Sequence, residues 1–500
     1  MTQTRNASPQ EGVQFAARDG RRSSQAAGKA ILAAAVRSVD ESLASRIENM
    51  KDWRKGYIAP FRDSVIAGAA SPKAALMIAT DGLDAVQNNL TFARSGEEIS
   101  RADAIASPTE RFETATVPGK GERVRELAIP YRGRVLSGDS LSTQLEVWET
   151  AGVIEASAAG ALTALMANPE WLDLSDLKFA VLGAASEMGP FGSLCSWGAT
   201  VMALDLPRPD LWTHILETAR AGSGTVLVPV SGENSGDIAT RAGIDLLTHA
   251  PEARAWLTQT EDPFTLGNYV YADGATFVRL AAAVDSLVAA VVAERPDVSL
   301  AYLATPTDVY AVPEELAAAA RATGRRSLAS RPLRALSGAR LYSPNYQQLV
   351  DGEDGRRWGI SDSLVPIQGP NYALAKSLQR WRAVVAREDG VVTSANVAPA
   401  SSTTSVTKNR MLAAAYRGAP AFGVEIFEPG TTRVLTAALL VHDLRNQSSA
   451  AHPAAPLRHP YDLFVEGAAH GGIWRLPHQP RSILPLGLIR GLVMRGKAGR

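Results

Sequence analysis

The segment Phe179–Asp205 constrains the fold of this chain more than any other stretch of its sequence. It opens with an apolar run that predicts a short buried strand; Gly183 ends this run and Gly189 follows six residues later. A second apolar run at 200–204 predicts another strand, and Asp205 comes directly after it. The order strand, glycine turn, helix, strand, acid is typical of dinucleotide binding, because the glycines let the backbone approach a pyrophosphate and the acid accepts hydrogen bonds from the adenosine ribose.

The same segment has a simpler interpretation, in which it is an ordinary βαβ unit whose glycines only make a tight turn. Glu187 stands where a third glycine is expected, and a carboxylate facing a pyrophosphate would repel it unless it points away. Further apolar runs at 225–230 and 298–305 alternate with helical segments. This alternation predicts an α/β fold built on a doubly wound, parallel, Rossmann-like sheet.

The chain has 500 residues, which is too long for one core of usual size, so two or three domains are expected. Residues 178–445 would form the Rossmann-like domain, with an insertion at 311–362 that lies over one face of the sheet and serves as a substrate lid. The flanking regions are expected to be a disordered N-terminus at 1–26, a helical N-terminal region at 27–124, a strand and one long helix at 125–177, and a linker with an apolar and basic tail at 446–500.

Composition narrows the class of protein and its partners. The formal net charge is zero, so no basic excess indicates nucleic acid. Cys195 is the one cysteine, which excludes an intrachain disulfide framework and fits a reducing cytoplasm. We expect no signal peptide, no membrane span and, from the spacing of the histidines, no metal site. The tail is expected to pack on its own chain or on a second copy in a homo-oligomer, and two other roles stay open, closing the active site and docking on a membrane surface.

Tyr372 and Lys376 stand four residues apart, which places both on one face of a helix. A lysine ammonium beside a phenol favours phenolate and lowers the pKa of the phenol. Such a phenol can give or take a proton at a carbonyl or alcohol oxygen near neutral pH. A serine hydroxyl could steady the same oxygen, and Ser363 and Ser361 are the upstream candidates. Taken alone, the pair is also typical of ordinary neighbours on a helix surface.

Three stretches, in this order along the chain, resemble the short-chain dehydrogenase/reductase family. GAASEMG at 183–189 is similar to the family's glycine motif, and YALAK at 372–376 is similar to its Tyr-x-x-x-Lys. VVTSANVAPASSTTSV at 391–406 resembles its sixth strand and the following loop, with Pro399 placed 27 residues after Tyr372, a spacing that the family favours. The resemblance covers about half of the chain.

The resemblance implies an NAD(P)-dependent oxidoreductase that transfers hydride between a nicotinamide and a small-molecule carbonyl or alcohol substrate. In that role Tyr372 is the proton donor or acceptor, and Lys376 lowers its pKa and touches the nicotinamide ribose. Asp205 favours NAD, while Arg208 leaves room for the 2′-phosphate of NADP. The implied cofactor-binding residues are Gly183, Ser186 and Gly189 at the phosphates, Asp205 at the adenosine ribose, and Pro399 with Thr403 or Thr404 at the nicotinamide end.

The chain departs from the family pattern after the strand expected at 298–305, where ATPTD stands in place of the usual Asn-Ala-Gly. A long insertion separates this strand from the Tyr/Lys pair, so Thr305 and Thr307 compete with Ser363 and Ser361 for the role of the catalytic serine. Two other functions stay open. One is a redox-neutral dehydratase or epimerase that keeps its nicotinamide bound, and the other is a non-catalytic scaffold in which the acid of the glycine loop has ended nucleotide binding.

Overall fold

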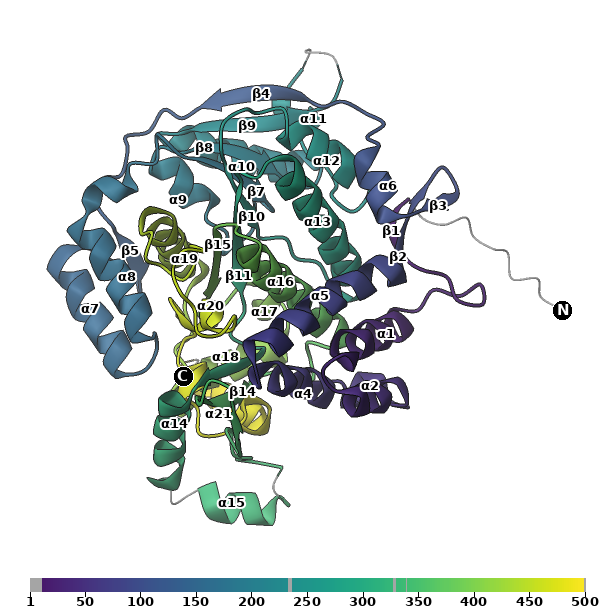
Figure 1. Ribbon diagram of the computed structural model, residues 1–500. Coiled ribbons are helices and arrows are strands. Elements are labelled where there is room, and N and C mark those ends of the chain that lie inside the picture. Colours follow the sequence, from purple (N-terminus) through teal and green to yellow (C-terminus); the bar gives the residue numbers. More distant parts are fainter. Residues whose placement is uncertain (1–10, 233–235, 327–329, 339, 499–500) are drawn as a thin grey trace.

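The computed structural model describes residues 11–232, 236–326, 330–338 and 340–498 (Figure 1). A seven-stranded sheet forms the centre of the molecule, with the spatial order β15-β11-β10-β7-β8-β9-β4. Its strands are parallel except for the edge strand β4, which runs antiparallel to β9. The strands are β4 (Glu113–Pro118), β7 (Lys178–Leu182), β8 (Thr200–Leu204), β9 (Thr225–Val230), β10 (Thr265–Asn268), β11 (Ser299–Ala304) and β15 (Thr393–Val397).

Counted along the chain, the six parallel strands lie in the order 3-2-1-4-5-6, which is the order known from dinucleotide-binding sheets. The order reverses between β7 and β10, so the chain leaves these two neighbouring strands in opposite directions. The strands predicted at 179–182, 200–204, 225–230 and 298–305 are confirmed, whereas β10 was not predicted, nor was β4, which lies in the region 27–124 expected to be helical. The structure is therefore a mixed α/β fold that is compatible with a Rossmann-like sheet.

Side chains alternate along the central strands and enter a separate core on each face of the sheet. In β7, Phe179 and Val181 point into one core, while Ala180 and Leu182 point into the other. Helices flank both faces, as Figure 1 shows. The first core is closed by α9 (Phe191–Ser196), α10 (Pro209–Ala221) and α19 (Pro429–Arg445), and the second by α12 (Ala250–Leu257), α13 (Gly274–Glu294) and α16 (Pro370–Glu388).

Among the described helices, α13 is the single one long and apolar enough to cross a membrane. Its apolar window is 61% buried inside the molecule, with Phe277, Val284 and Val291 in the core beside the sheet. Length and composition alone do not separate a membrane span from the central helix of a folded core, and this burial is what a core helix requires.

The N-terminal region packs onto α16 and α13 rather than standing apart. Gly12–Phe15 forms the strand β1 inside the segment expected to be disordered, because Val13 and Phe15 are buried and the Val13 N–H donates to the Leu247 carbonyl at 3.0 Å. Residues 1–10 lie outside the described residues. The other elements are α1 (Ser24–Arg37), α2 (Glu41–Glu48), α3 (Trp53–Gly56), α4 (Ile58–Ala69), α5 (Pro72–Asn89), β2 (Leu90–Arg94), β3 (Glu97–Ile99) and α6 (Arg101–Ala106).

The single long helix expected within 125–177 is two helices. Gly152 adopts a φ of +66°, a left-handed conformation that ends a right-handed helix, so α7 stops before it and α8 begins afterwards. The region comprises the hairpin β5 (Ile129–Tyr131) and β6 (Arg134–Leu136), then α7 (Gly138–Thr150), α8 (Ala156–Ala167) and η1 (Pro169–Leu172).

The insertion forms a small antiparallel sheet of its own, with the order β12-β14-β13, which packs against α4 and carries α14 against η3. Its described elements are β12 (Val309–Pro313), α14 (Glu314–Arg326), α15 (Ser330–Leu336), β13 (Leu349–Asp351) and β14 (Arg357–Asp362). The remaining short helices are α11 (Ile238–Arg241), α17 (Thr404–Thr407), α18 (Arg410–Gly418), η2 (Ala419–Phe422), α20 (Asp462–Val465), η3 (Ile473–Arg475) and the longer α21 (Pro480–Ala498).

Candidate functional site

A cavity of about 970 Å³ opens at the carboxyl ends of the parallel strands. It is lined by the segments that leave β7, β8, β10, β11 and β15 and by the first turns of α16. Ligands of open α/β sheets bind outside the carboxyl ends of the strands where the strand order reverses, and this cavity lies at that position. Its volume is at the upper end of the range found for small-molecule pockets.

Seven of the nine predicted site residues line this one cavity, although they come from segments up to 220 residues apart. They are Gly183, Ser186, Asp205, Tyr372, Lys376, Pro399 and Thr403. The other two lie elsewhere. Gly189, the last residue of the glycine motif, is buried, and Ser363 is fully buried beside Ser361, with 3.2 Å between their hydroxyl oxygens.

The glycine loop begins at Gly183, which adopts a φ of +84°. A side chain there would lie 3.0 Å from the Tyr269 carbonyl oxygen, so glycine is needed where the loop passes the end of β10. The start of the loop is tied to the end of β8, because the N–H groups of Gly183 and Ala184 donate to the Leu204 carbonyl at 2.9 and 3.1 Å. Within the loop, the Ser186 N–H donates to the Gly183 carbonyl at 2.9 Å. These three amides are therefore already paired within the protein.

Asp205 follows β8 and points back at this loop. Its Oδ2 accepts from the Ala185 N–H and its Oδ1 from the Leu206 N–H, both at 2.8 Å. Burial raises the pKa of the Asp205 carboxyl, while these two hydrogen bonds act in the opposite direction. A carboxylate has about four lone-pair sites, so the two amides leave acceptor capacity toward the cavity.

Glu187 turns away from the loop amides and bridges the cavity wall to α17. Its carboxylate accepts from the Thr404 N–H at 2.7 Å and also from the Thr404 hydroxyl. The Glu187 carbonyl oxygen accepts from the Arg433 guanidinium at 3.1 Å. The loop after β7 and the loop after β15 are thus joined by a carboxylate, at the place where the sequence predicted phosphate binding.

Tyr372 stands in the first turn of α16, where Gly369, with a φ of +80°, and Pro370 start the helix. Its half-buried ring packs against Phe277 and Tyr271, with centroid distances of 5.8 and 6.5 Å. Burial raises the pKa of the phenol, and a hydrogen bond with the Thr305 side chain lowers it by less. The net direction is opposite to the effect expected from Lys376.

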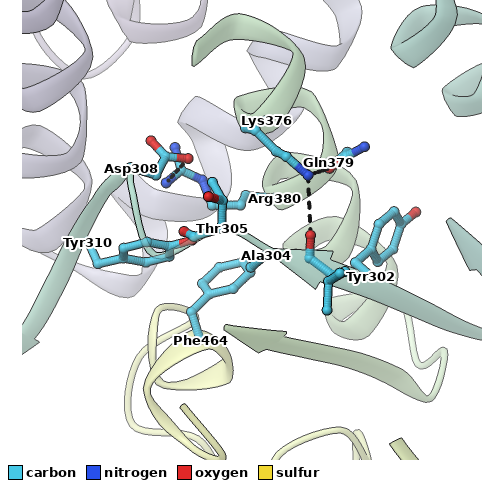
Figure 2. Close-up of a pocket in the computed structure, with 10 residues that line it drawn as sticks. Tyr302, Ala304, Thr305, Asp308, Tyr310, Lys376, Gln379, Arg380 and Phe464 are labelled. Carbon is cyan, nitrogen blue, oxygen red and sulfur yellow. Dashed lines mark hydrogen bonds and ion pairs between the residues drawn. The ribbon is translucent and has the colours of Figure 1, made fainter. Parts of the chain in front are cut away.

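The Lys376 ammonium does not pair with the phenol. It donates to the Leu303 carbonyl at 3.2 Å and to Gln379 Oε1 at 2.9 Å, so α16 is tied to the end of β11 (Figure 2). Its Nζ also lies 5.9 Å from the centre of the Phe277 ring. Burial lowers the pKa of Lys376 to about 8, and the nearby Asp308 carboxylate partly offsets this.

Asp308 and Arg380 are site residues that the sequence did not single out. Asp308 is buried beside the small cavity of Figure 2, and Arg380 Nη1 lies 2.9 Å from its carboxylate. Arg380 follows Lys376 by one helical turn, and this i, i+4 spacing was the available signal. Of the four hydroxyl candidates, Thr305 and Thr307 line the large cavity, whereas Ser361 and Ser363 do not.

The far end of the cavity is apolar and is walled by α18, η2 and α21 rather than by the insertion. Its lining there includes Leu412, Tyr416, Phe422, Ile426, Ile473, Leu476, Ile483 and Leu484. No described residue of 311–362 reaches the cavity, so the expected lid is not formed by that segment. The C-terminal tail takes this place instead, and the sequence had indicated closure of the site only as one of its possible roles.

No group of three or more His, Cys, Asp or Glu in the described part of the chain is arranged to hold a metal ion. Cys195 is buried within α9, and burial raises the pKa of its thiol to about 12. Comparison of the chain with protein-family models, with curated proteins and with solved structures returned no match.

Proposed function

We propose that this protein is an NAD(P)-dependent oxidoreductase that interconverts a carbonyl and an alcohol, on a doubly wound Rossmann-like sheet of the short-chain dehydrogenase/reductase type. The observation that carries the proposal is the shared cavity. The loop at 183–188, Asp205, the Tyr372/Lys376 pair and the loop at 399–403 all line it, although nothing in their local sequences requires them to meet.

The residues of the cavity fit a dinucleotide at its polar end. Gly183 lets a ligand approach the backbone without a side chain in the way, and Asp205 keeps lone pairs available for ribose hydroxyls. A bound nicotinamide would supply the hydride or accept it. NAD is slightly favoured over NADP, because the half-buried Asp205 carboxylate would repel a 2′-phosphate.

Tyr372 is suited to donate a proton rather than to accept one. Its raised pKa keeps the phenol protonated at neutral pH, so it can hydrogen-bond a carbonyl oxygen and transfer its proton as that oxygen gains charge. Thr305, which hydrogen-bonds the phenol, would take the steadying role first considered for Ser363. The site therefore favours reduction of a carbonyl, and the apolar far end of the cavity favours a substrate with a large apolar part.

Two measurements test the proposal. The first is thermal unfolding with NAD, NADH, NADP and NADPH, of which at least one should stabilise the protein. The second is turnover of a carbonyl panel with the nucleotide that binds: Tyr372→Phe should abolish turnover and leave nucleotide binding nearly intact. Tyr342→Phe, at a half-buried tyrosine outside the cavity, is the matched control and should keep full activity. Wild-type activity in Tyr372→Phe would refute the assigned role.

One observation favours the non-catalytic alternative. The loop amides of Gly183, Ala184 and Ser186 donate within the protein, and Glu187 already holds Thr404. Absence of stabilisation by all four nucleotides would support this scaffold and refute the oxidoreductase. A redox-neutral enzyme would differ from both, because the purified protein would absorb in the band of reduced nicotinamide without added cofactor.

A further inference from the structure

The helices α18 and α21 form an antiparallel pair that closes the apolar end of the cavity. They pack with their backbones in contact: a Cβ at Gly418 would overlap the Gly487 carbonyl, and a Cβ at Gly491 would overlap the Ala414 carbonyl. In these two contacts the residue numbers rise along α18 as they fall along α21, so the two helices run antiparallel. Figure 1 shows this pair in the half of the molecule away from β4, between the central sheet and α15.

Each helix of the pair has one face toward the cavity and another toward solvent. On α18, Leu412 and Tyr416 line the cavity, whereas Arg410 and Arg417 lie about half a turn away and are exposed. On α21, the exposed Ile489, Leu492 and Val493 lie away from the cavity-lining Ile483 and Leu484, and the exposed Arg490 lies at the edge of this group. We call the exposed residues the α18–α21 outer face: Arg410, Met411, Arg417, Ile489, Arg490, Leu492 and Val493.

The α18–α21 outer face combines exposed apolar side chains with positively charged arginines. Met411 is 63% exposed, and Ile489, Leu492 and Val493 are 58%, 53% and 56% exposed. The sequence has no aspartate or glutamate within 404–422 or 480–498, so the arginines have no carboxylate on their own helices to neutralise them. Large exposed apolar side chains that cluster on one face mark an interaction surface.

We propose that the α18–α21 outer face docks on an anionic lipid bilayer. A bilayer accepts both of its features, because apolar side chains enter the boundary of the acyl chains while arginines stay at the negatively charged headgroups. A symmetric contact with a second copy would gather the arginines of both copies at one interface with no carboxylate on these helices to neutralise them, and this repulsion disfavours it. The proposal does not depend on the proposed function. If both hold, the apolar end of the cavity lies directly beneath the membrane-facing helices.

The test is flotation of the full-length protein with vesicles of phosphatidylcholine alone or of an equal mixture of phosphatidylcholine and phosphatidylglycerol. Binding is expected to the anionic vesicles only and should weaken as salt is added. Each of Arg410→Gln, Arg417→Gln and Arg490→Gln should weaken binding about fivefold, because one cation near such a surface contributes on that scale. Ile489→Asp with Leu492→Asp should abolish binding.

Val135→Asp is the matched control, since Val135 is 69% exposed on β6, outside this face, and its substitution should leave binding unchanged. The arginine variants keep the test valid if the double aspartate variant does not fold, because they change only exposed side chains. Equal binding to neutral and anionic vesicles, or no binding, would overturn the proposal. So would a concentration-dependent dimer in gel filtration that Arg490→Gln or Ile489→Asp alters while vesicle binding is absent, because the face would then contact a second copy.

Discussion

Replacing Glu187 by glutamine tests whether the loop after β7 faces a pyrophosphate. The substitution keeps the shape and one acceptor oxygen for Thr404 but removes the negative charge. A unit charge repels another at 4 Å by about 1 kcal/mol in water and by more in a half-buried site. Glu187→Gln should therefore bind the preferred nucleotide at least about fivefold more tightly, since 1 kcal/mol corresponds to that ratio.

The same substitution should destabilise the protein without ligand. The carboxylate accepts the first N–H of α17 and the Thr404 hydroxyl, and replacing this charged acceptor by a neutral amide weakens its interaction with the positive end of the helix by up to about 1 kcal/mol. Titration calorimetry measures the affinity and thermal unfolding measures the stability, so one variant moves the two quantities in opposite directions. Glu314→Gln is the control, because Glu314 pairs with Arg357 outside the cavity. Weaker nucleotide binding by Glu187→Gln would refute phosphate binding at this loop.

Two further predictions concern buried charges. Because the pKa of Lys376 is lowered to about 8 in the folded protein, the unfolded chain binds more protons between that pH and its ordinary value near 10.5. The unfolding free energy of the wild type should therefore rise relative to Lys376→Met across this window, as urea unfolding at several pH values can show, and a flat difference would contradict the assignment. Asp285→Asn should cost about 3–5 kcal/mol in urea unfolding, because Asp285 is buried with the Arg382 Nε 2.7 Å away and its loss leaves that charge unpaired. Asp210→Asn, which breaks an exposed pair with Arg208, should cost less than about 1 kcal/mol, and equal costs would show that burial is not the cause.

The sequence predicted the central strands that it marks with apolar runs and missed two that it does not, β4 and β10. β10 has only the residues TLGN, and Gly267 and Asn268 both disfavour strands. It forms because β7 and β11 pair with it on both sides, in parallel register. A glycine fits there, since a Cβ at Gly267 would overlap the Tyr269 ring. Residues 265–268 form a strand because they pair with neighbouring strands, and no pattern in the local sequence predicts it.

The sequence predicted which residues line the candidate site, but it did not predict their hydrogen-bond partners or the direction of their pKa shifts. The spacing of Tyr372 and Lys376 placed both on one helix, and both line the cavity. Their environments come from Phe277 and Leu303, some 70 to 100 residues earlier in the chain, which bury the pair and take up the ammonium. The sequence also could not predict that α18 and α21 form a wall of the cavity, because helix packing through glycines leaves no signal in hydrophobic periodicity.

The pKa of Lys376 lies below that of Tyr372, which is the reverse of their order in water, and this affects how such a site would work. In water a tyrosine phenol, with a pKa near 10, loses its proton before a lysine ammonium, with a pKa near 10.5. Here burial raises the pKa of Tyr372 and lowers that of Lys376 to about 8, because each group is pushed toward its neutral form. The lysine therefore gives up its proton first, and the phenol stays a donor throughout the neutral range. A pH-dependent loss of carbonyl reduction near pH 8 would then report Lys376, and Tyr372 would limit the rate only in more alkaline solution.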